Sequence, residues 1–400
     1  MSDQSRFKFI FFIVVTSSIG QIAAEVYIPS LPYISHDFQV SSSLVQLSIA
    51  VFLFGMSLPG ILFGYISDFF GRRKILLVAT TLSALGTFVC LIAPNIYILI
   101  FGRFIQGLGF SGVGSLSRAI LRDRMTGVEL ARYVSYLAMI TVLAIDVSPF
   151  IGGFLQEYFG WRPIFALLLI YNLLAIYLSY SFKDIAATNL NDELYLKRIL
   201  HITWESLREP LFFKYNVLSA LCYAAVMSLL TVASFLFEQV LRLSPVEFGS
   251  TMLGLSFVYM FGAFLNGKLL RYFTMNQLIC NGIIIMWLSV AFLIIVTVCF
   301  SINYWTFVWF IALFWLGCSA LFANSSSIAF SVIHKNIGVS SALFSTVQIL
   351  FAAIITAAIS SFSAYSTVPL TIFLFGICLG LTMLYNWKVY AKVETKSEEY

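Results

Sequence analysis

Three ionisable side chains, Glu25, Arg103 and Asp146, fall inside long apolar runs of this 400-residue chain. A charge at the centre of a bilayer costs at least about 2.5 to 3.5 kcal/mol, so such residues normally face a polar cavity or a partner. A carboxyl group at that depth can bind and release a proton as its surroundings change. These residues therefore predict movement of protons and a solute rather than covalent chemistry.

Glu25 ends a polar stripe with Ser17 and Gln21 at four-residue steps, shortly before Pro29. Residues four apart share a helix face, so the stripe predicts a first helix with one wet face toward an interior cavity. We expect Glu25 to exchange a proton against a substrate. The alternative is a structural ion pair between Glu25 and Arg103, which lie at similar depths.

Asp146 lies about 13 residues, or about 20 Å, from the inner end of its span, near the bilayer midplane. It shares a helix face with Pro149 and Gly153. The sequence leaves a coupling or substrate role and a structural carboxyl both open. Arg103 shares a face with Gln106 and is expected to meet a polar cavity and an acidic partner. Its alternative is a side chain that snorkels to the nearby outer surface.

The second half of the chain has no ionisable residue deep in a predicted span. Its candidates for a central cavity are neutral: Asn324, and a stripe formed by Ser341, Ser345 and Gln348. The three histidines map to loops, which makes carboxylates the better proton carriers.

The composition excludes a water-soluble fold, because 60% of residues are hydrophobic, 10% are charged and the mean hydropathy is +0.95. Basic residues are scattered through short loops, so the net charge of +5 does not predict nucleic-acid binding. The six cysteines lack paired spacing, which indicates neither a disulfide frame nor a zinc site. No cluster suited to a membrane enzyme is present, and no cofactor is predicted.

A window of about 19 residues predicts twelve membrane-spanning helices. The first is too long for a signal peptide and is expected to be retained. The predicted spans are 7–28, 43–66, 74–93, 96–118, 133–156, 162–182, 213–237, 245–269, 276–300, 302–325, 339–362 and 367–389. All lysines and arginines fall on one side except Arg103, Arg162 and Arg242, so both termini are predicted to be cytoplasmic, in a bacterial inner membrane.

A polar stretch at 183–212 divides the spans six and six. We therefore expect a bundle over 1–182, a cytoplasmic linker over 183–212, a second bundle over 213–389 and a tail over 390–400. Apolar residues at helical spacing in the linker favour an amphipathic helix on the inner membrane surface as much as an ordinary linker. Residues 64–71 align with 267–274 at half the chain length, which supports an internal repeat.

The segment GYISDFFGRRK between the second and third spans resembles the signature loop of the major facilitator superfamily. Its residues are Gly64, Asp68, Gly71, Arg72 and Arg73. The glycines permit a tight turn, and Asp68 can pair with Arg72 or face a helix N-terminus. The resemblance implies a gate latch on the cytoplasmic side, near the eleventh span.

Two further segments resemble motifs of the same superfamily. FGRFIQGLGFSG in the fourth span carries Arg103 of the arginine motif. SPFIGGFL in the fifth span is similar to the antiporter motif, with Ser148 where glycine is usual. Its Pro149, Gly152 and Gly153 are expected to bend and thin the helix for packing against the opposite half.

The first span, AAEVYIPSLPYIS, resembles the drug:proton antiporter branch of the Bcr/CflA type. This resemblance implies an all-α major facilitator fold, with two six-helix bundles around a central cavity. It also implies a monomer that exports lipophilic neutral or cationic molecules by antiport with protons, with Glu25 at the branch's acidic position. The alternative is a dedicated transporter of one metabolite, by siderophore export or proton-symport uptake.

Overall fold

The computed structural model describes residues 3–181, 192–300, 302–333 and 337–387. These residues form helices joined by short turns, as the apolar runs predict. The elements are α1 (Asp3–Glu25), η1 (Ile28–Ser30), α2 (Leu31–Asp37), α3 (Ser42–Ser57), α4 (Gly60–Phe70), α5 (Arg72–Leu91), α6 (Ile96–Arg124), α7 (Gly127–Phe159), α8 (Arg162–Ser181), α9 (Asp192–Arg208), α10 (Pro210–Phe235), η2 (Leu236–Val240), α11 (Pro245–Leu269), α12 (Met275–Cys299), α13 (Tyr304–Ser331), α14 (Ile337–Ser360) and α15 (Thr367–Asn386).

Eleven helices of the described residues are long and apolar enough to cross a membrane. A bent pair, Ser42–Ser57 with Leu62–Phe70, makes a twelfth span, with 44° between its parts. The break falls at Pro59, which lacks an N–H and cannot continue the hydrogen bonds of α3. The predicted count of twelve is confirmed, but the expected continuous span at 43–66 is broken.

The first span also differs from the prediction of 7–28. Helix α1 ends at Glu25, and the chain continues through η1 and α2 to Asp37. Pro29 and Pro32 lie at the first turns of η1 and α2, where proline is tolerated and restarts a helix. The regular α-helix is therefore interrupted directly after its acidic residue, within a span that runs from Lys8 to Asp37.

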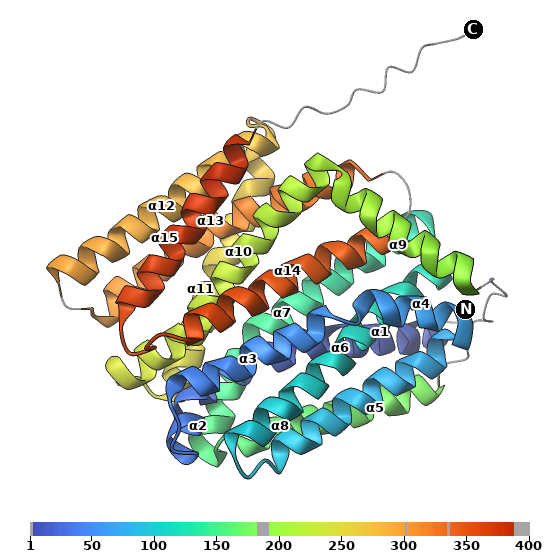
Figure 1. Ribbon diagram of the computed structural model, residues 1–400, viewed down its shortest axis with the longest axis horizontal. Helices are drawn as coiled ribbons and strands as arrows, with labels where there is room; N and C mark the ends of the chain where they lie inside the picture. Colours follow the sequence, from blue (N-terminus) through green and yellow to red (C-terminus); the bar gives the residue numbers. More distant parts are fainter. Residues whose placement is uncertain (1–2, 182–191, 301, 334–336, 388–400) are drawn as a thin grey trace, which may run out of the picture.

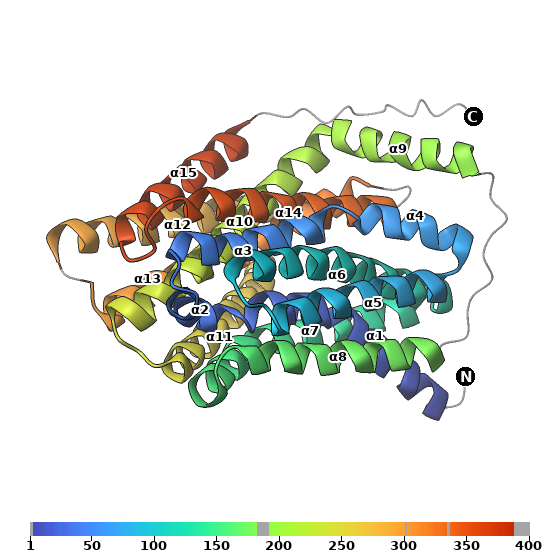
Figure 2. The same cartoon turned by 60° about the horizontal axis from the view of Figure 1, so that its bottom comes forward.

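The helices form two groups that meet along two seams (Figure 1). Helices α1 to α8 make one group, and α10 to α15 make the other. One seam pairs α3 with α14, and the second pairs α7 with α11. The two views agree that α9 and the start of α1 lie at one end of the molecule, whereas α2 and the turn between α10 and α11 lie at the other (Figure 2).

Helix α9 occupies much of the expected linker, whose residues 183–191 lie outside the described part, as does the tail at 390–400. It contacts α4, α10 and α14, and the hydroxyls of Ser206 and Ser340 lie 3.1 Å apart. Ile199 and Ile202 are buried, while Trp204 is exposed and stacks with Arg208. The helix thus has a buried and an exposed face, as the amphipathic alternative predicts.

Backbone contacts at glycines set the helix spacing. A methyl group on Gly107 of α6 would overlap the carbonyl oxygen of Phe52 on α3. On α7, a methyl group on Gly152 would overlap the carbonyl oxygen of Val26, and one on Gly153 that of Pro245 at the start of α11. Small residues at such crossings let backbones approach closely. The seam between α7 and α11 therefore depends on the glycines of the antiporter-like motif.

Replacing Gly107 with alanine should destabilise the protein. The added methyl group has no space between two backbones, so we expect a loss of about 1 to 3 kcal/mol in the free energy of unfolding. Thermal unfolding of the purified protein in detergent would measure the loss. Gly114→Ala is the matched control on the same helix, because nothing lies within 4 Å of a methyl group there. Equal melting temperatures for both variants would contradict the packing argument.

Candidate functional site

A cavity of about 650 Å³ lies between the two helix groups. Its walls come mainly from α1, α6 and α7 on one side and from α10, α11, α13 and α14 on the other. Most of the lining is apolar or aromatic, with Phe110, Tyr223, Tyr259, Trp315 and Phe322 among its side chains. A cavity of this size and lining suits a small, largely apolar molecule.

Two carboxyl groups from different helices face this cavity: Glu25 at the end of α1 and Asp146 in α7. They lie close enough for Asp146 to act electrostatically on Glu25. Glu25 is only 7% exposed, and Oδ2 of Asp146 has no hydrogen-bond partner within the described residues. Ser256 of α11 interacts with the Asp146 carboxyl from the opposite group. The cavity therefore brings both predicted carboxyls together.

The predicted polar stripes also reach the cavity wall. Ser17 and Gln21 line it on α1, and the hydroxyl of Tyr223 on α10 donates to Oε1 of Gln21 at 3.4 Å. On α14, Gln348 lines the cavity and donates from Nε2 to the hydroxyl of Ser219 at 2.6 Å. Neutral polar contacts from both groups thus surround the carboxyl pair.

Arg103 lies elsewhere, and the expectation that it faces the cavity is wrong. Its side chain is 0% exposed inside the first helix group. Nη1 donates to the carbonyl oxygen of Ala23 at 3.1 Å and to Oε1 of Gln106 at 2.7 Å. The guanidinium carbon lies 4.8 Å from the ring centre of Tyr27 and 3.9 Å from that of Phe52. Cation–π contacts therefore take the place of the expected acidic partner.

These contacts decide between the alternatives that the sequence left open for Arg103. Full burial excludes a snorkelling side chain. Among the described residues Arg103 forms no ion pair with Glu25, because its charge is directed at a carbonyl, an amide and two rings. Glu25 therefore faces the cavity without an ion pair to Arg103.

Two predicted cavity residues, Gln106 and Asn324, are buried within single helix groups instead. Gln106 accepts from Arg103 and donates from Nε2 to the hydroxyl of Thr87 at 2.8 Å. Asn324 on α13 donates from Nδ2 to Oδ1 of Asn266 on α11 at 2.7 Å. Both side chains fasten neighbouring helices, because a buried amide must satisfy its hydrogen bonds locally.

Two arginines of α6, Arg118 and Arg122, line the cavity mouth. Helix α6 continues to Arg124, beyond the expected end at 118, and Arg118 and Arg122 lie one turn apart on it. The side chain of Arg118 is exposed within the cavity. The absence of proline and glycine between Ser115 and Arg124 was the available signal that the helix continues past the membrane.

The second helix group also buries charge, near the two ends of α10. Lys214 near the start of α10 donates from Nζ to the carbonyl oxygens of Tyr385 and Trp387, at 2.9 and 2.8 Å, at the end of α15. A cation at a helix C-terminus is stabilising. Glu238 in η2 is 6% exposed and lies one residue beyond the predicted span 213–237. Both groups therefore bury charged side chains, although Lys214 and Glu238 lie at the edges of the predicted span and not deep within it.

The signature loop forms a charge cluster at the cavity-mouth end, here called the gate cluster. Arg72 pairs with Asp68 at 2.6 Å and with Asp123 of α6 at 3.1 Å, and it donates to the hydroxyl of Ser67 at 2.5 Å. Gly71 has a φ of 93°, which glycine adopts readily at the turn from α4 to α5. The pair of Asp68 with Arg72 follows from the motif, whereas Asp123 becomes evident only in the fold.

The opposite end of the cavity is closed by contacts between the two groups. Gly153 packs on Pro245, and a methyl group on Gly249 would lie 2.6 Å from the carbonyl oxygen of Pro149. Oε2 of Glu157 on α7 accepts from the backbone N–H of Val246 in the first turn of α11 at 3.0 Å. A carboxylate at a helix N-terminus is stabilising. One polar and several backbone contacts hold this end together.

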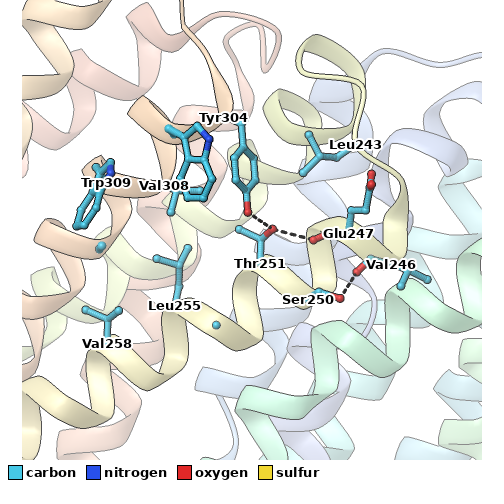
Figure 3. A pocket seen from close by; sticks show the side chains of 13 residues that line it. Leu243, Val246, Glu247, Ser250, Thr251, Leu255, Val258, Tyr304, Val308 and Trp309 are labelled. Carbon is cyan, nitrogen blue, oxygen red and sulfur yellow. Dashed lines mark hydrogen bonds between the residues drawn. The ribbon is translucent and has the colours of Figure 1, made fainter.

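A second recess, of about 760 Å³, lies between α11 and α13 at this closed end (Figure 3). At its side the hydroxyls of Thr251 and Tyr304 lie 3.1 Å apart. Two exposed tryptophans, Trp305 and Trp309, also line it. Its acidic residue, Glu247, accepts from the N–H of Ser244 and so caps α11. This recess belongs to one helix group and lacks the carboxyl pair of the central cavity.

Comparison with known proteins identifies the family. The family model described as "Major Facilitator Superfamily" matches residues 10–354. The chain belongs to this superfamily. A bicyclomycin resistance protein homolog of Haemophilus influenzae is 24% identical over 385 residues, covering 96% of each chain. Multidrug resistance protein D of Escherichia coli is 28% identical over 170 residues, covering 42% of this chain and 43% of its own.

Other relatives carry less functional information. An MFS-type transporter of Bacillus subtilis, YdgK, is 29% identical over 296 residues, covering 71% of this chain and 74% of its own. Among solved structures, a D-xylose-proton symporter matches with a TM-score of 0.74 at 14% identity, over 97% of this chain and 98% of its own. That likeness confirms the major facilitator fold. Membership of the superfamily makes the protein a multi-pass membrane transporter.

The placement of Arg103 in this transporter can be tested by Arg103→Lys. Lysine keeps the charge but loses the planar guanidinium between two rings, so we expect unfolding to become easier by about 1 to 3 kcal/mol. Denaturant titration in detergent micelles measures the change. Arg162→Lys is the control, because Arg162 also meets a carbonyl and a ring, those of Ala93 and Trp161, but is exposed. A larger loss in the control would refute the structural role of Arg103.

Proposed function

We propose that this protein is a proton-coupled secondary transporter of the bacterial inner membrane that exports lipophilic neutral or cationic molecules by antiport. The observation that carries the proposal is the pair of carboxyls, Glu25 and Asp146, facing one cavity between two helix groups. A charged carboxylate in an apolar cavity without a compensating cation is costly. Its protonation therefore depends on water and substrate, both of which change as a cavity opens and closes.

Alternating access is supported by the difference between the two ends of the cavity. Its lining extends to Arg122 and Ser341 at one end, while Gly153 and Glu157 meet α11 at the other. The basic residues of the gate cluster lie at the open end, which the positive-inside rule assigns to the cytoplasm. We infer an inward-facing state with cytoplasmic termini, in which the two helix groups rock about the α3/α14 and α7/α11 seams.

Drug export is supported by relatives named for bicyclomycin and multidrug resistance. The apolar and aromatic cavity wall suits lipophilic molecules, and Glu25 with Asp146 suits neutral or cationic ones. One charge crossing about 100 mV releases about 2.3 kcal/mol, which supports a concentration gradient of roughly 40-fold. We propose that the monomer is the functional unit, because one chain supplies both carboxyls and both cavity walls.

A dedicated transporter of one metabolite is the second candidate. Arg118 and Arg122 give the cavity mouth a positive charge. Neither arginine is in an ion pair within the described residues. A molecule with an anionic group, such as a siderophore, suits this mouth better than a cationic drug does.

Glu25→Gln tests proton coupling. In energised everted vesicles, addition of a transported drug should dissipate the pH gradient for the natural protein. The variant should give only the response of vesicles without the protein, because glutamine cannot release a proton. Glu247→Gln is the control, since Glu247 is an exposed carboxylate outside the cavity. Unchanged drug-dependent proton movement in Glu25→Gln, with normal amounts of folded protein, would exclude Glu25 as the carrier.

Arg118→Gln separates the two substrate classes. If the protein exports cationic drugs, we expect the variant to keep or improve resistance in a drug-sensitive host, because a repelling charge is removed. If it moves an anionic metabolite, transport of that solute should fall at least about tenfold, corresponding to about 1.4 kcal/mol of lost binding. Arg132→Gln, an exposed arginine beyond the cavity lining, should change neither.

A further inference from the structure

Glu238 is a buried carboxyl that neither the carboxyl pair nor the gate cluster uses. Its side chain is 6% exposed, and neither of its oxygens has a hydrogen-bond donor within the described residues. Buried polar groups are almost always hydrogen-bonded, and a buried charge is almost always paired. An acidic side chain with neither kind of partner therefore needs an explanation.

The backbone around Glu238 is also unusual. Leu236–Val240 forms a π-helix at the end of α10, where the N–H of Leu241 donates to the carbonyl oxygen of Leu236 at 2.9 Å. Single π-turns of this kind occur frequently at functional sites. The two residues that precede Glu238, Leu236 and Phe237, are buried. The ring centre of Phe237 lies 5.0 Å from that of Phe307. The carboxyl is thus held in an apolar part of the protein.

Glu238 lies where the two helix groups close against each other. Helix α10 contacts η1 and α2 of the first group, and η2 contacts α11. Tyr33 of α2 interacts electrostatically with both Glu238 and Glu157. In Figures 1 and 2, α2 and the turn that follows α10 lie at the end away from α9, which is the closed end of the cavity.

The charged and titratable groups around Glu238 do not neutralise it. Tyr33 on α2 is neutral or negative, and Glu157 on α7 and Glu247 on α11 are acidic. Arg242 in the following turn is exposed and forms no ion pair with Glu238 among the described residues. Tyr304 of α13 lies on the far side of the Phe237 ring, 6.1 Å between ring centres.

We propose that Glu238 is a second proton-binding residue, in the C-terminal helix group, that links protonation to closure of the end opposite the cavity mouth. When this end is closed, the carboxyl is neutral, because a charge there has neither water nor a partner. When the end opens, water reaches the carboxyl and the proton leaves to the outer solution. Closing the end again requires a proton from that same side.

This inference rests on alternating access in the proposed function, but not on antiport or on the identity of the substrate. In this proposal, Glu238 at the end of α10 exchanges protons with the outer solution. Glu25 and Asp146 face the cavity, which is open to the cytoplasmic side. Two carboxyl sites on different gates would let external and internal pH act independently on the two ends. A proton bound at Glu238 favours the inward-facing arrangement without occupying the substrate cavity.

Hydrogen–deuterium exchange of the full-length protein in lipid nanodiscs tests the proposal without a substrate. With exchange times corrected for the intrinsic pH dependence, peptides from α2 and from the start of α11 should exchange faster as pH rises from mildly acidic to mildly alkaline. In Glu238→Gln this pH response should be lost, with the peptides protected throughout. Glu238→Asp should keep it, because the shorter side chain still titrates.

Glu247→Gln is the matched control at the same end. Glutamine can replace glutamate in the capping box of α11, as Gln277 does in the box of α12. The control should therefore respond to pH as the natural protein does. A Glu238→Gln variant that retains the natural response overturns the proposal, and so does equal loss in Glu238→Gln and Glu238→Asp, which indicates a steric role. Neither result depends on whether Glu25 couples transport.

Discussion

The cost of holding a charge away from water is the constraint on which the rest of this structure depends. Within apolar surroundings each ionised side chain must find hydrogen bonds, a counter-charge, an aromatic face or solvent. Arg103 meets this requirement with a carbonyl, an amide and two rings, and Lys214 with two carbonyl oxygens at the end of α15. These two charges are therefore part of the scaffold that fixes neighbouring helices.

The buried acids are treated differently. Glu25 and Asp146 face a shared cavity, and Glu238 lies at the closed end with no donor in the described part of the chain. Their favourable state depends on water access, which only relative movement of the helix groups can change. Arg103 and Lys214 are held by contacts inside the helix groups, whereas the three acids face the cavity or lie at its closed end, and this difference separates residues that hold the fold from those proposed to move protons.

For the two helix groups to move relative to each other, the helices at their seams must pack closely without large side chains that interlock. Glycines let α7 approach its neighbours at backbone distance. Gly152 lies against Val26, directly after α1, and Gly153 and Gly249 lie where α7 meets α11. At the other end Arg72 pairs with Asp68 and Asp123, and all three residues belong to the first helix group. Glycine contacts are short in range, so the closed end can separate without disrupting a large apolar core.

The sequence by itself determined the membrane class, the number of spans and the family, because hydropathy and the Gly64 to Lys74 motif are local properties of the chain. It also predicted that Ser17, Gln21 and Glu25 share one helix face, since helical spacing fixes that relation. It could not predict that Pro59 breaks the second span, because a proline can kink or end a helix depending on its neighbours.

Only the tertiary structure decided which polar residues share a space. It placed Glu25 and Asp146 in the lining of one cavity and Arg118 at the mouth of that cavity. It buried three other polar side chains within one helix group or the other: Arg103, Gln106 and Asn324. The reason is physical: periodicity tells which residues lie on one face of a helix, but not which neighbour that face meets. A buried polar face can be satisfied equally by a partner helix or by a cavity, and packing between distant segments makes the choice.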